Sequence, residues 1–415
     1  MNSAKKDDRV EHLRRSGRAG ARAWLGWLGA IALCAATAAG DEVRIGYIGL
    51  ERSDQEPLSL LDVALDDDGV QGARLAVVDN NGTGRFMGQE FVLSEVIVER
   101  DGDVAAAFDE LVENGADWVV SGLPAEQLRQ VLASPRARDG VTIFNARAPD
   151  DELRNEECRA NLFHTVPSRA MQTDALAQFL TYKRWSRWAL VVGNTEEDAL
   201  HAAALRRAAR RFGGNIVGEL QWPHTPLARR AEGGFHAIQR EVPVLLQNLP
   251  DHDILLLVDE TDYFGEYVPY QTWRPRPVGG TQGLIATGWH RAHESWGAVQ
   301  LHRRFESQAN RPMTPLDFAA WVAVRAVGEA ATRTGTGAAP TEAIVDYLLS
   351  EDFALGAYLG HPLSFRSWDR QLRQPILVTG PRMVASVSPQ EGFIHPRTPL
   401  DSLGHDELES ACALD

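Results

Sequence analysis

Polar and small residues stand where predicted strands end in the first part of the chain. They are Glu51, Ser121, Gly122, Asn145 and Ala146. Ligands of open α/β sheets bind beyond the carboxyl ends of the strands, so these positions indicate reversible binding of a small molecule. For Ser121 an alternative stays open, because its hydroxyl could instead cap a helix that begins near Pro124.

A second group of candidates follows the predicted strands in the middle of the chain. They are Thr195, Asp259, Glu260 and Trp289. Trp289 offers an apolar wall to a ligand, and the two acids offer negative charge. The alternatives are that Trp289 packs within a domain and that Asp259 and Glu260 are solvated loop charges.

The sequence contains no complete motif for catalysis, metal binding or nucleotide binding. There is no G-x-S-x-G nucleophile elbow, and Cys158 has no evident base partner. The glycines of 82–88 have the wrong spacing for a dinucleotide loop and predict a turn. His290, His293 and His302 lack the companion ligands of a zinc site and are expected at the surface. We therefore expect a protein that is not an enzyme, with no cofactor and no metal.

The elements that position these residues alternate between strands and helices in two successive blocks. The expected strands cover 42–48, 91–98, 118–121 and 141–145 in the first block, and 188–192, 216–220 and 254–258 in the second. Uninterrupted apolar runs such as Ile254–Val258 suit central strands of a parallel sheet that helices cover on both faces. The pattern predicts an α/β protein with two doubly wound, parallel-sheet lobes.

Capping residues set the expected limits of the helices. A helix from Val70 should stop at 80–82, where Asn-Asn-Gly stands, while Ser168 and Thr195 should start later helices. After Ile285 helices dominate. From Pro396 the chain is polar and acidic, and we expect a loosely held tail over 396–415.

The first 38 residues predict export. Basic residues up to Arg22 precede an apolar run over 24–36, and 36–38 supply small residues for cleavage. This order is typical of a secretory signal peptide, and the apolar run is too short to span a membrane. The chain has a net charge of −15, which gives no electrostatic footprint for nucleic acid. We expect a periplasmic, soluble monomer.

Cys158 and Cys412 are the cysteines that remain after removal of the signal peptide. In an oxidising compartment they are expected to form a disulfide. The alternative is two unpaired thiols, one of them on a disordered tail.

Several segments resemble a family of binding proteins. Val78–Gly88 resembles the N-x-x-G-G-i-x-G stretch of branched-chain-amino-acid-type periplasmic binding proteins. Asn161–Ser168 resembles their crossover into the second lobe, and Thr314–Glu329 resembles their long helix. Phe163–Met171 and Ser364–Pro375 are similar to the branch found with PQQ-dependent alcohol oxidation systems.

The resemblance extends over 41–395 and implies a type I periplasmic binding protein, with three crossovers between two lobes and a ligand cleft between them. Lobe one would hold 41–162 with 290–350, and lobe two 163–289 with 351–395. The implied function is the substrate-binding component of an ABC importer, linked to PQQ-dependent alcohol oxidation. It would capture a small organic solute by hinge closure and pass it to an inner-membrane permease. The alternative is a periplasmic sensor that signals to a membrane partner.

The resemblance also assigns roles at the first group of strand ends. Ser121 and Gly122 match the position where a hydroxyl and backbone amides near a helix start hold a ligand carboxylate. Asn145 and Ala146 match the neighbouring strand end.

At the second group, Asp259 or Glu260 would match the acid that balances an α-amino group. One departure bears on the ligand. The aromatic-glycine pair of the amino-acid binders is replaced by Thr195-Glu-Glu-Asp198. This difference argues against α-amino-acid specificity.

Overall fold

The computed structural model describes residues 41–51, 65–138, 140–223, 234–335 and 341–414. The expected signal peptide, 1–38, lies outside the described residues. The described residues belong to one unit of the chain, 39–415. In these described ranges, no helix is both long enough and apolar enough to cross a membrane.

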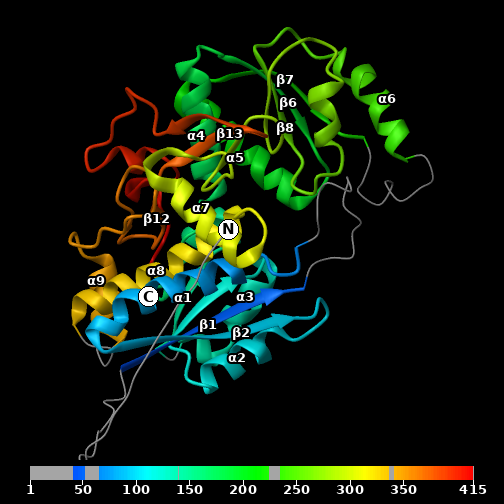
Figure 1. Cartoon of the computed structure of the whole chain (residues 1–415). Helices are drawn as coiled ribbons and strands as arrows, with labels where there is room; N and C mark the ends of the chain where they lie inside the picture. Colours follow the sequence, from blue (N-terminus) through cyan, green and yellow to red (C-terminus); the bar gives the residue numbers. More distant parts are fainter. Residues whose placement is uncertain (1–40, 52–64, 139, 224–233, 336–340, 415) are drawn as a thin grey trace, which may run out of the picture. The chain divides into compact units, whose positions relative to one another are not determined.

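The first sheet has five parallel strands in the order β2-β1-β3-β4-β5 (Figure 1). The strands are β1 Asp41–Leu50, β2 Gln89–Val98, β3 Trp118–Gly122, β4 Thr142–Asn145 and β5 Leu162–His164. Its helices are α1 Val70–Met87, α2 Val104–Glu113, α3 Ala125–Ala133, α7 Ala298–Ala309, α8 Pro315–Thr334 and α9 Thr341–Leu349. We call this sheet with its helices the first lobe.

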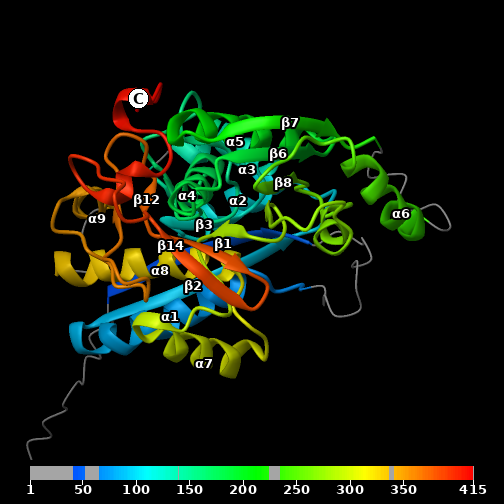
Figure 2. The ribbon, with the colours of Figure 1, turned by 90° about the horizontal axis from the view of Figure 1, so that it is seen from above.

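Alternating side chains give the first sheet two apolar faces. Ile45, Trp118 and Phe144 pack in one core with α1, α7, α8 and α9. Ile48 and Val119 point the other way, into a core with α2 and α3. Figure 2 shows α1 and α8 side by side along the sheet. Burial on both faces explains the apolar run at the start of β3, whereas the edge strand β2 is partly exposed.

The second sheet has four parallel strands in the order β7-β6-β8-β9. The strands are β6 Arg187–Val192, β7 Asn215–Gln221, β8 Ile254–Val258 and β9 Val278–Gly280. The helices are α4 Arg169–Tyr182, α5 Glu196–Phe212 and α6 Gly234–Leu246. Helices α4 and α5 cover one face and α6 the other. We call this sheet with its helices, together with the antiparallel strands described next, the second lobe.

Three further strands form an antiparallel sheet beside the second one. They are β10 Ile285–Thr287, β13 Ile376–Gly380 and β14 Met383–Ser388, which pair in the order β10-β13-β14. Helix α4 packs against all three strands. A short hairpin, β11 Ser364–Phe365 with β12 Leu372–Arg373, stands between β10 and β13 in the sequence.

The chain passes between the two lobes three times. Strand β5 of the first sheet leads into α4 of the second lobe. Strand β10 then leads into α7, which packs on α1 of the first lobe. The third passage runs from α9 through the β11–β12 hairpin to β13. Each lobe is therefore made of separated parts of the sequence.

Helix α1 is longer than the sequence indicated. The expected stop at 80–82 is wrong, because α1 continues to Met87 and ends at Gly88, which is left-handed with φ 71°. The two asparagines serve tertiary contacts instead of ending the helix. Asn80 Nδ2 donates to the Val324 carbonyl 2.9 Å away on α8, and the Asn81 side chain pairs with the backbone of Phe91.

The glycines of 82–88 are likewise not a turn, because 82–87 belong to α1. Gly84 is needed there for a close approach to the next strand. A Cβ built on Gly84 would lie 2.8 Å from the carbonyl oxygen of Gln89. The chain therefore reverses directly from α1 into β2, with Gly88 as the only connecting residue.

The segment after α9 packs differently from the expected lobe boundary at 350/351. Phe353 and Phe365 belong to the core of the first lobe, and the rings of Phe365 and Phe163 meet edge-on with centroids 5.0 Å apart. Pairing with the second lobe begins only at β13. The helix and strand pattern did not show this, since it does not reveal which core an apolar residue joins.

The tail over 396–415 is not loosely held. Leu400 and Leu403 are buried, and Asp401 is fully buried between two arginines. Arg366 Nε donates to Asp401 Oδ1 at 3.0 Å, and Arg373 Nε donates to the same oxygen at 2.8 Å. A polar composition suggested solvation, but these partners come from the β11–β12 hairpin, which local composition cannot indicate.

Candidate functional site

Backbone hydrogen bonds tie together the carboxyl ends of the first-sheet strands. The N–H of Ala146 donates to Ser121 O at 2.9 Å, and the N–H of Glu51 donates to Val98 O at 2.7 Å. Glu51 is exposed, whereas Ser121 and Ala146 are buried. The fold thus brings Ser121 and Ala146 together, as expected for adjacent strands.

The side chain of Asn145 is used within its own loop. Its Oδ1 accepts from the N–H groups of Arg147 at 3.1 Å and Ala148 at 2.8 Å. Its Nδ2 donates to the Ala148 carbonyl at 2.8 Å and lies 3.1 Å from His164 Nδ1. Asn145 is fully buried, so this amide shapes the loop after β4.

Ser121 and Gly122 are also enclosed. Ser121 is fully buried, and its Oγ accepts from the Leu123 N–H at 3.4 Å, close to the start of α3. A Cβ on Gly122 would lie 2.3 Å from the hydroxyl oxygen of Tyr47, which explains why glycine stands there. Arg147 and Glu51 are the exposed charged side chains at this edge, and Arg147 Nη1 donates to the Gly122 carbonyl at 3.4 Å.

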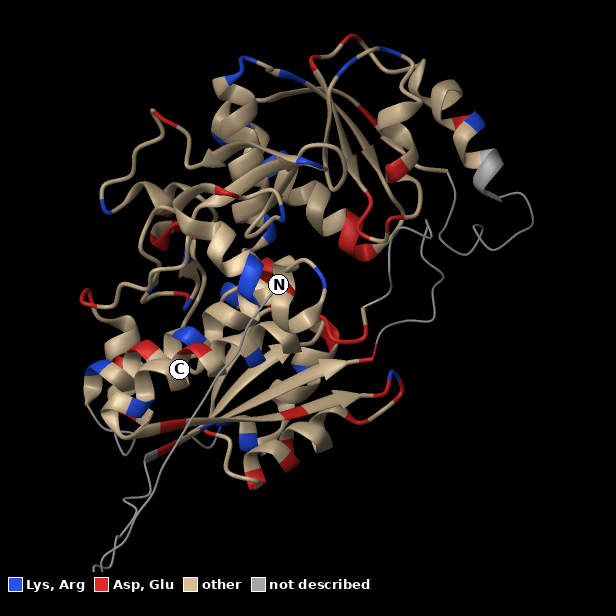
Figure 3. Ribbon diagram, in the orientation of Figure 1, with Lys and Arg blue, Asp and Glu red and all other residues tan. Residues whose placement is uncertain are grey.

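The second sheet carries a charged group at its strand ends. Thr195 and Asp198 form a reciprocal capping box at the start of α5, whose first turn is acidic (red in Figure 3). Asp198 also accepts from the Glu260 N–H at 2.8 Å, which ties the loop after β8 to α5. Thr195, Asp259 and Glu260 therefore lie together, as expected for one sheet edge.

Asp259 organises the turn that follows β8. Its carboxylate accepts from the N–H groups of Tyr263, Phe264 and Gly265 at 2.7–3.0 Å. Burial raises the pKa of Asp259 above its ordinary value, and the three N–H groups offset part of this shift. The side chain is 1% exposed, so it stabilises the turn and is not a solvated charge.

Glu260 is the partly exposed acid of this edge, and two side chains occupy its carboxylate. Arg169 Nε donates to Glu260 Oε1 at 3.2 Å, and His201 Nδ1 lies 2.8 Å from the same oxygen. Because an ionised carboxylate only accepts, Nδ1 carries the proton of that bond. Arg169 also forms an ion pair with Asp150 at 3.1 Å, so it joins the loop after β4 to the second sheet.

These contacts control the ionisation of Glu260. Burial acts to raise its pKa, but the hydrogen bond and charge of His201, together with Arg169, outweigh burial and lower the pKa to about 2. The side chain of Glu260 is 26% exposed to solvent, and that of Arg169 is 4% exposed. Glu260 is therefore ionised at neutral pH, and its charge is already balanced.

Trp289 lies apart from these residues, in the core of the first lobe. It is fully buried and stacks on Phe318 of α8, with ring centroids 4.3 Å apart. The histidines near it are not at the surface as expected. His293 and His302 are buried, and His302 Nε2 lies 3.0 Å from the His293 carbonyl. Their rings pack against Trp289, with centroids 5.4 and 5.0 Å from its ring.

Arg169 and His201 were missed from the sequence. Arg169 stands directly after Ser168, the N-cap residue of α4, and His201 lies on α5, six residues after Thr195. The sequence signal that could have indicated them was their position near the start of a helix that follows a strand. Their pairing with Glu260 spans 91 and 59 residues, so spacing alone could not reveal it.

No group of three or more His, Cys, Asp or Glu side chains arranged to hold a metal occurs among the residues that the structure describes. The edges instead present backbone groups, the exposed Arg147 and Glu51, and Glu260, which Arg169 and His201 contact. This arrangement suits reversible recognition of a small polar molecule.

Comparisons with known proteins identify proteins of similar fold. A family model described as periplasmic binding protein matches residues 57–231. A branched-chain amino acid ABC transporter periplasmic ligand-binding protein from Burkholderia xenovorans aligns over 90% of this chain and 99% of its own, with 14% identity and a TM-score of 0.67. The chain has the type I periplasmic binding protein fold.

Two further solved structures share this fold. One is a leucine-, isoleucine-, valine-, threonine- and alanine-binding protein from Brucella ovis, with 15% identity, coverage of 90% and 99%, and a TM-score of 0.65. The other is an ABC transporter solute-binding protein from R. palustris in complex with benzoate, with 13% identity, coverage of 90% and 100%, and a TM-score of 0.63. A search of curated protein sequences found no match.

Proposed function

We propose that this chain is the substrate-binding component of an ABC importer, acting as a monomer in the periplasm. It captures a small organic solute when its two lobes close about the crossing segments, and delivers the solute to an inner-membrane permease. The observation that carries the proposal is the alignment of its fold with 99% of a transporter ligand-binding protein. The family match over 57–231 and the export signal expected over 1–38 support the same role.

The charges at the strand ends bear on the class of solute. Among the proteins with this fold, one is named for aliphatic amino acids and another was solved with benzoate. An amino-acid ligand needs a free acid for its ammonium group, and here Glu260 is already balanced by Arg169 and His201. Arg147 and Glu51 are exposed at the edge of the first sheet. Because the acid of the second sheet is already occupied, we favour an acidic or neutral solute held by Arg147 over an amino acid whose ammonium group binds Glu260.

A link to PQQ-dependent alcohol oxidation is part of the proposal, and the resemblance of 163–171 and 364–375 supports it. The second of these segments forms the β11–β12 hairpin and supplies Arg366 and Arg373 to a buried charge cluster. Its role is thus to hold the fold. The expected solutes are the products of such oxidation, small aldehydes and carboxylic acids.

A thermal-shift screen of the processed protein tests the proposal. The panel covers amino acids, short and aromatic carboxylates, alcohols, aldehydes and PQQ. A ligand at 100 times its Kd stabilises a folded protein by about 2.7 kcal/mol, which raises the Tm measurably. We expect a carboxylate or aldehyde to raise the Tm and amino acids to leave it unchanged.

A matched pair of variants locates the binding. Arg147→Ala should abolish or weaken the shift caused by an acidic solute, because it removes the exposed cation at the first-sheet edge. Arg136→Ala is the control, since Arg136 is also exposed but lies on η1 (Pro135–Arg138), before the amino end of β4, and pairs with Glu113 of α2. A folded protein that responds to nothing in the panel would contradict the proposal and favour a partner-sensing role.

A further inference from the structure

The C-terminal residues 398–412 form a connection between the lobes, which we call the C-terminal strap. Its first part lies on the second lobe. Gln178 Nε2 of α4 donates to Ser402 Oγ at 3.0 Å, and the Gly404 N–H donates to Asp174 Oδ2 at 2.9 Å. Further along, Arg207 Nη2 of α5 donates to Glu409 Oε2 at 2.7 Å.

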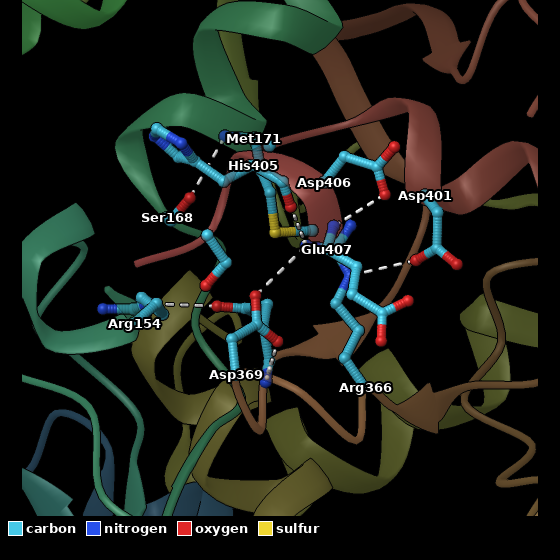
Figure 4. Close-up of polar contacts among 12 residues, drawn as sticks. Arg154, Ser168, Met171, Arg366, Asp369, Asp401, His405, Asp406 and Glu407 are labelled. Carbon is cyan, nitrogen blue, oxygen red and sulfur yellow. Dashed lines mark hydrogen bonds and ion pairs between the residues drawn. The ribbon is translucent and has the colours of Figure 1, made fainter. Parts of the chain in front are cut away.

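A buried charge cluster fixes the beginning of the strap. Arg366 pairs with Asp401 at 3.0 Å and with Asp369 at 3.5 Å, and its Nη2 donates to the Leu403 carbonyl at 2.7 Å. Figure 4 shows Arg366 beside Asp401 and Asp369. Side-chain exposure is 1% for Arg366 and 0% for Asp401. Because separating such a pair leaves a buried charge unbalanced, the strap stays attached to the β11–β12 hairpin, while the fully buried Asp174 holds Gly404 to α4 of the second lobe.

The end of the strap is bonded to the first lobe. Cys412 forms a disulfide with Cys158, with Cα atoms 5.6 Å apart, and the Ala411 N–H donates to Asn155 Oδ1 at 2.5 Å. The loop that carries Cys158 is held on α3, where Arg129 pairs with Glu157 at 2.7 Å. Asn161 Nδ2 also donates to the Val141 carbonyl at 2.8 Å. Cys158 therefore moves with the first lobe.

We propose that the C-terminal strap is a covalent tether that limits how far the two lobes can open. Two residues, Ser410 and Ala411, separate Glu409, the last contact with α5, from Cys412, and the three Cα-to-Cα steps span about 10 Å when fully extended. Wider opening at this edge requires either the Arg207–Glu409 contact or the disulfide to break. This inference rests on the lobe movement of the proposed function. It does not depend on which ligand is bound.

The tether and the three crossing segments have different effects on the movement of the lobes. Those segments are hinges, which bend and allow the lobes to separate on the far side. A fourth link that is anchored at both ends restricts the open state and brings it closer in shape to the closed state. Binding then requires less rearrangement, so the tether should increase affinity for any ligand that the closed form holds.

Single-molecule energy transfer tests the tether without a ligand. Dyes carried by unnatural amino acids replace Glu113 on α2 and Arg210 on α5, both exposed and on different lobes. In the double variant Cys158→Ser with Cys412→Ser, we expect the distribution of dye distances to widen toward longer values. A distribution identical to that of the parent protein would overturn the proposal.

A second variant keeps the disulfide and removes only the restriction in length. Six glycines inserted between Glu409 and Ser410 should widen the distribution as the serine pair does. The same six glycines inserted after Cys412, outside the tethered stretch, should leave it unchanged. If the tethered insertion has no effect while the protein stays folded, the strap is only a packing element. The proposed function fails separately, if no solute narrows the distribution in any variant.

Discussion

The carboxyl ends of the two parallel sheets are built from different chemistry. In the first sheet, the loop after β4 is organised by the neutral amide of Asn145, which bonds to Arg147, Ala148 and His164. In the second sheet, the loop after β8 is organised by Asp259, Asp198 and the Glu260 contacts. Both loops are closed. The loop after β4 is shaped around a neutral amide, with Arg154 and the Arg169–Asp150 pair at its far end, whereas the loop after β8 is organised by carboxylates.

The difference follows from the cost of burying each kind of group. A buried amide needs hydrogen bonds to replace those with water, and one short loop can supply them. Asp259 is held by N–H groups of its own turn, but the half-buried charge of Glu260 also needs an opposite charge, which comes from other elements. Arg169 at the start of α4 and His201 on α5 both serve Glu260. The second edge is therefore the one that couples elements across the molecule.

Removal of the cation that joins the two edges should give the largest effect. Arg169→Met leaves Asp150 and Glu260 without their shared partner, and we expect the free energy of unfolding to fall by roughly 3–5 kcal/mol. Urea unfolding followed by circular dichroism measures this loss. The control is Arg206→Met, which breaks an exposed pair with Glu219 and should cost less than about 1 kcal/mol. Equal losses would show that the Arg169 pairs add nothing beyond a surface contact.

The acid of the second edge should show its contribution through pH. Because the pKa of folded Glu260 is lowered to about 2 from an ordinary 4.5, its stabilisation is complete above pH 4.5 and is lost as the pH falls toward 2. Glu260→Gln should therefore be less stable than the parent by on the order of 3 kcal/mol at pH 7. The two should converge between pH 4.5 and 2.

Unfolding free energies at a series of pH values test this convergence. The matched control is Glu219→Gln, which removes an exposed carboxylate paired with Arg206 and should cost less than about 1 kcal/mol. A difference between parent and Glu260→Gln that stays constant down to pH 2 would mean that His201 and Arg169 do not hold the carboxylate in its charged form.

A neutral substitution at the first edge should give the smallest effect of the three. Asn145→Ala removes the acceptor of two backbone N–H groups and should lower the free energy of unfolding by about 2 kcal/mol, with no change in pH profile. Ser121→Ala is the matched control, because its Oγ accepts one long bond of 3.4 Å, and it should cost below about 1 kcal/mol. A pH-dependent loss in Asn145→Ala would contradict the contrast between the edges.

Much of the fold could be predicted because the signals that define it are local. The apolar run Ile254–Val258 is the fully buried strand β8, and the Thr195 cap starts α5 where expected. Ser168 likewise starts α4, with its Oγ accepting from the Met171 N–H at 3.2 Å. Each of these depends on residues within a few positions of one another.

Predictions based on turn-forming residues were less successful where those residues had distant partners. Asn80 and Asn81 resemble a helix stop, yet both side chains bond to other elements and α1 continues past them. The acidic tail reads as solvated, but Asp401 is buried against Arg366, 35 residues earlier in the chain. Composition reports how polar a segment is and not whether its polar groups find partners.

The sequence by itself determined the alternation of strands and helices, the starts of the main helices and the edges of the sheets where a solute would be held. Only the tertiary structure decided which side chains at those edges remain available. Asn145 and Asp259 are consumed by their own loops, Glu260 is balanced by Arg169 and His201, and Arg147 is left exposed. The physical reason is the separation in sequence over which each signal acts, because capping and periodicity involve residues only a few positions apart. The satisfaction of a buried charge depends instead on groups that only folding brings together.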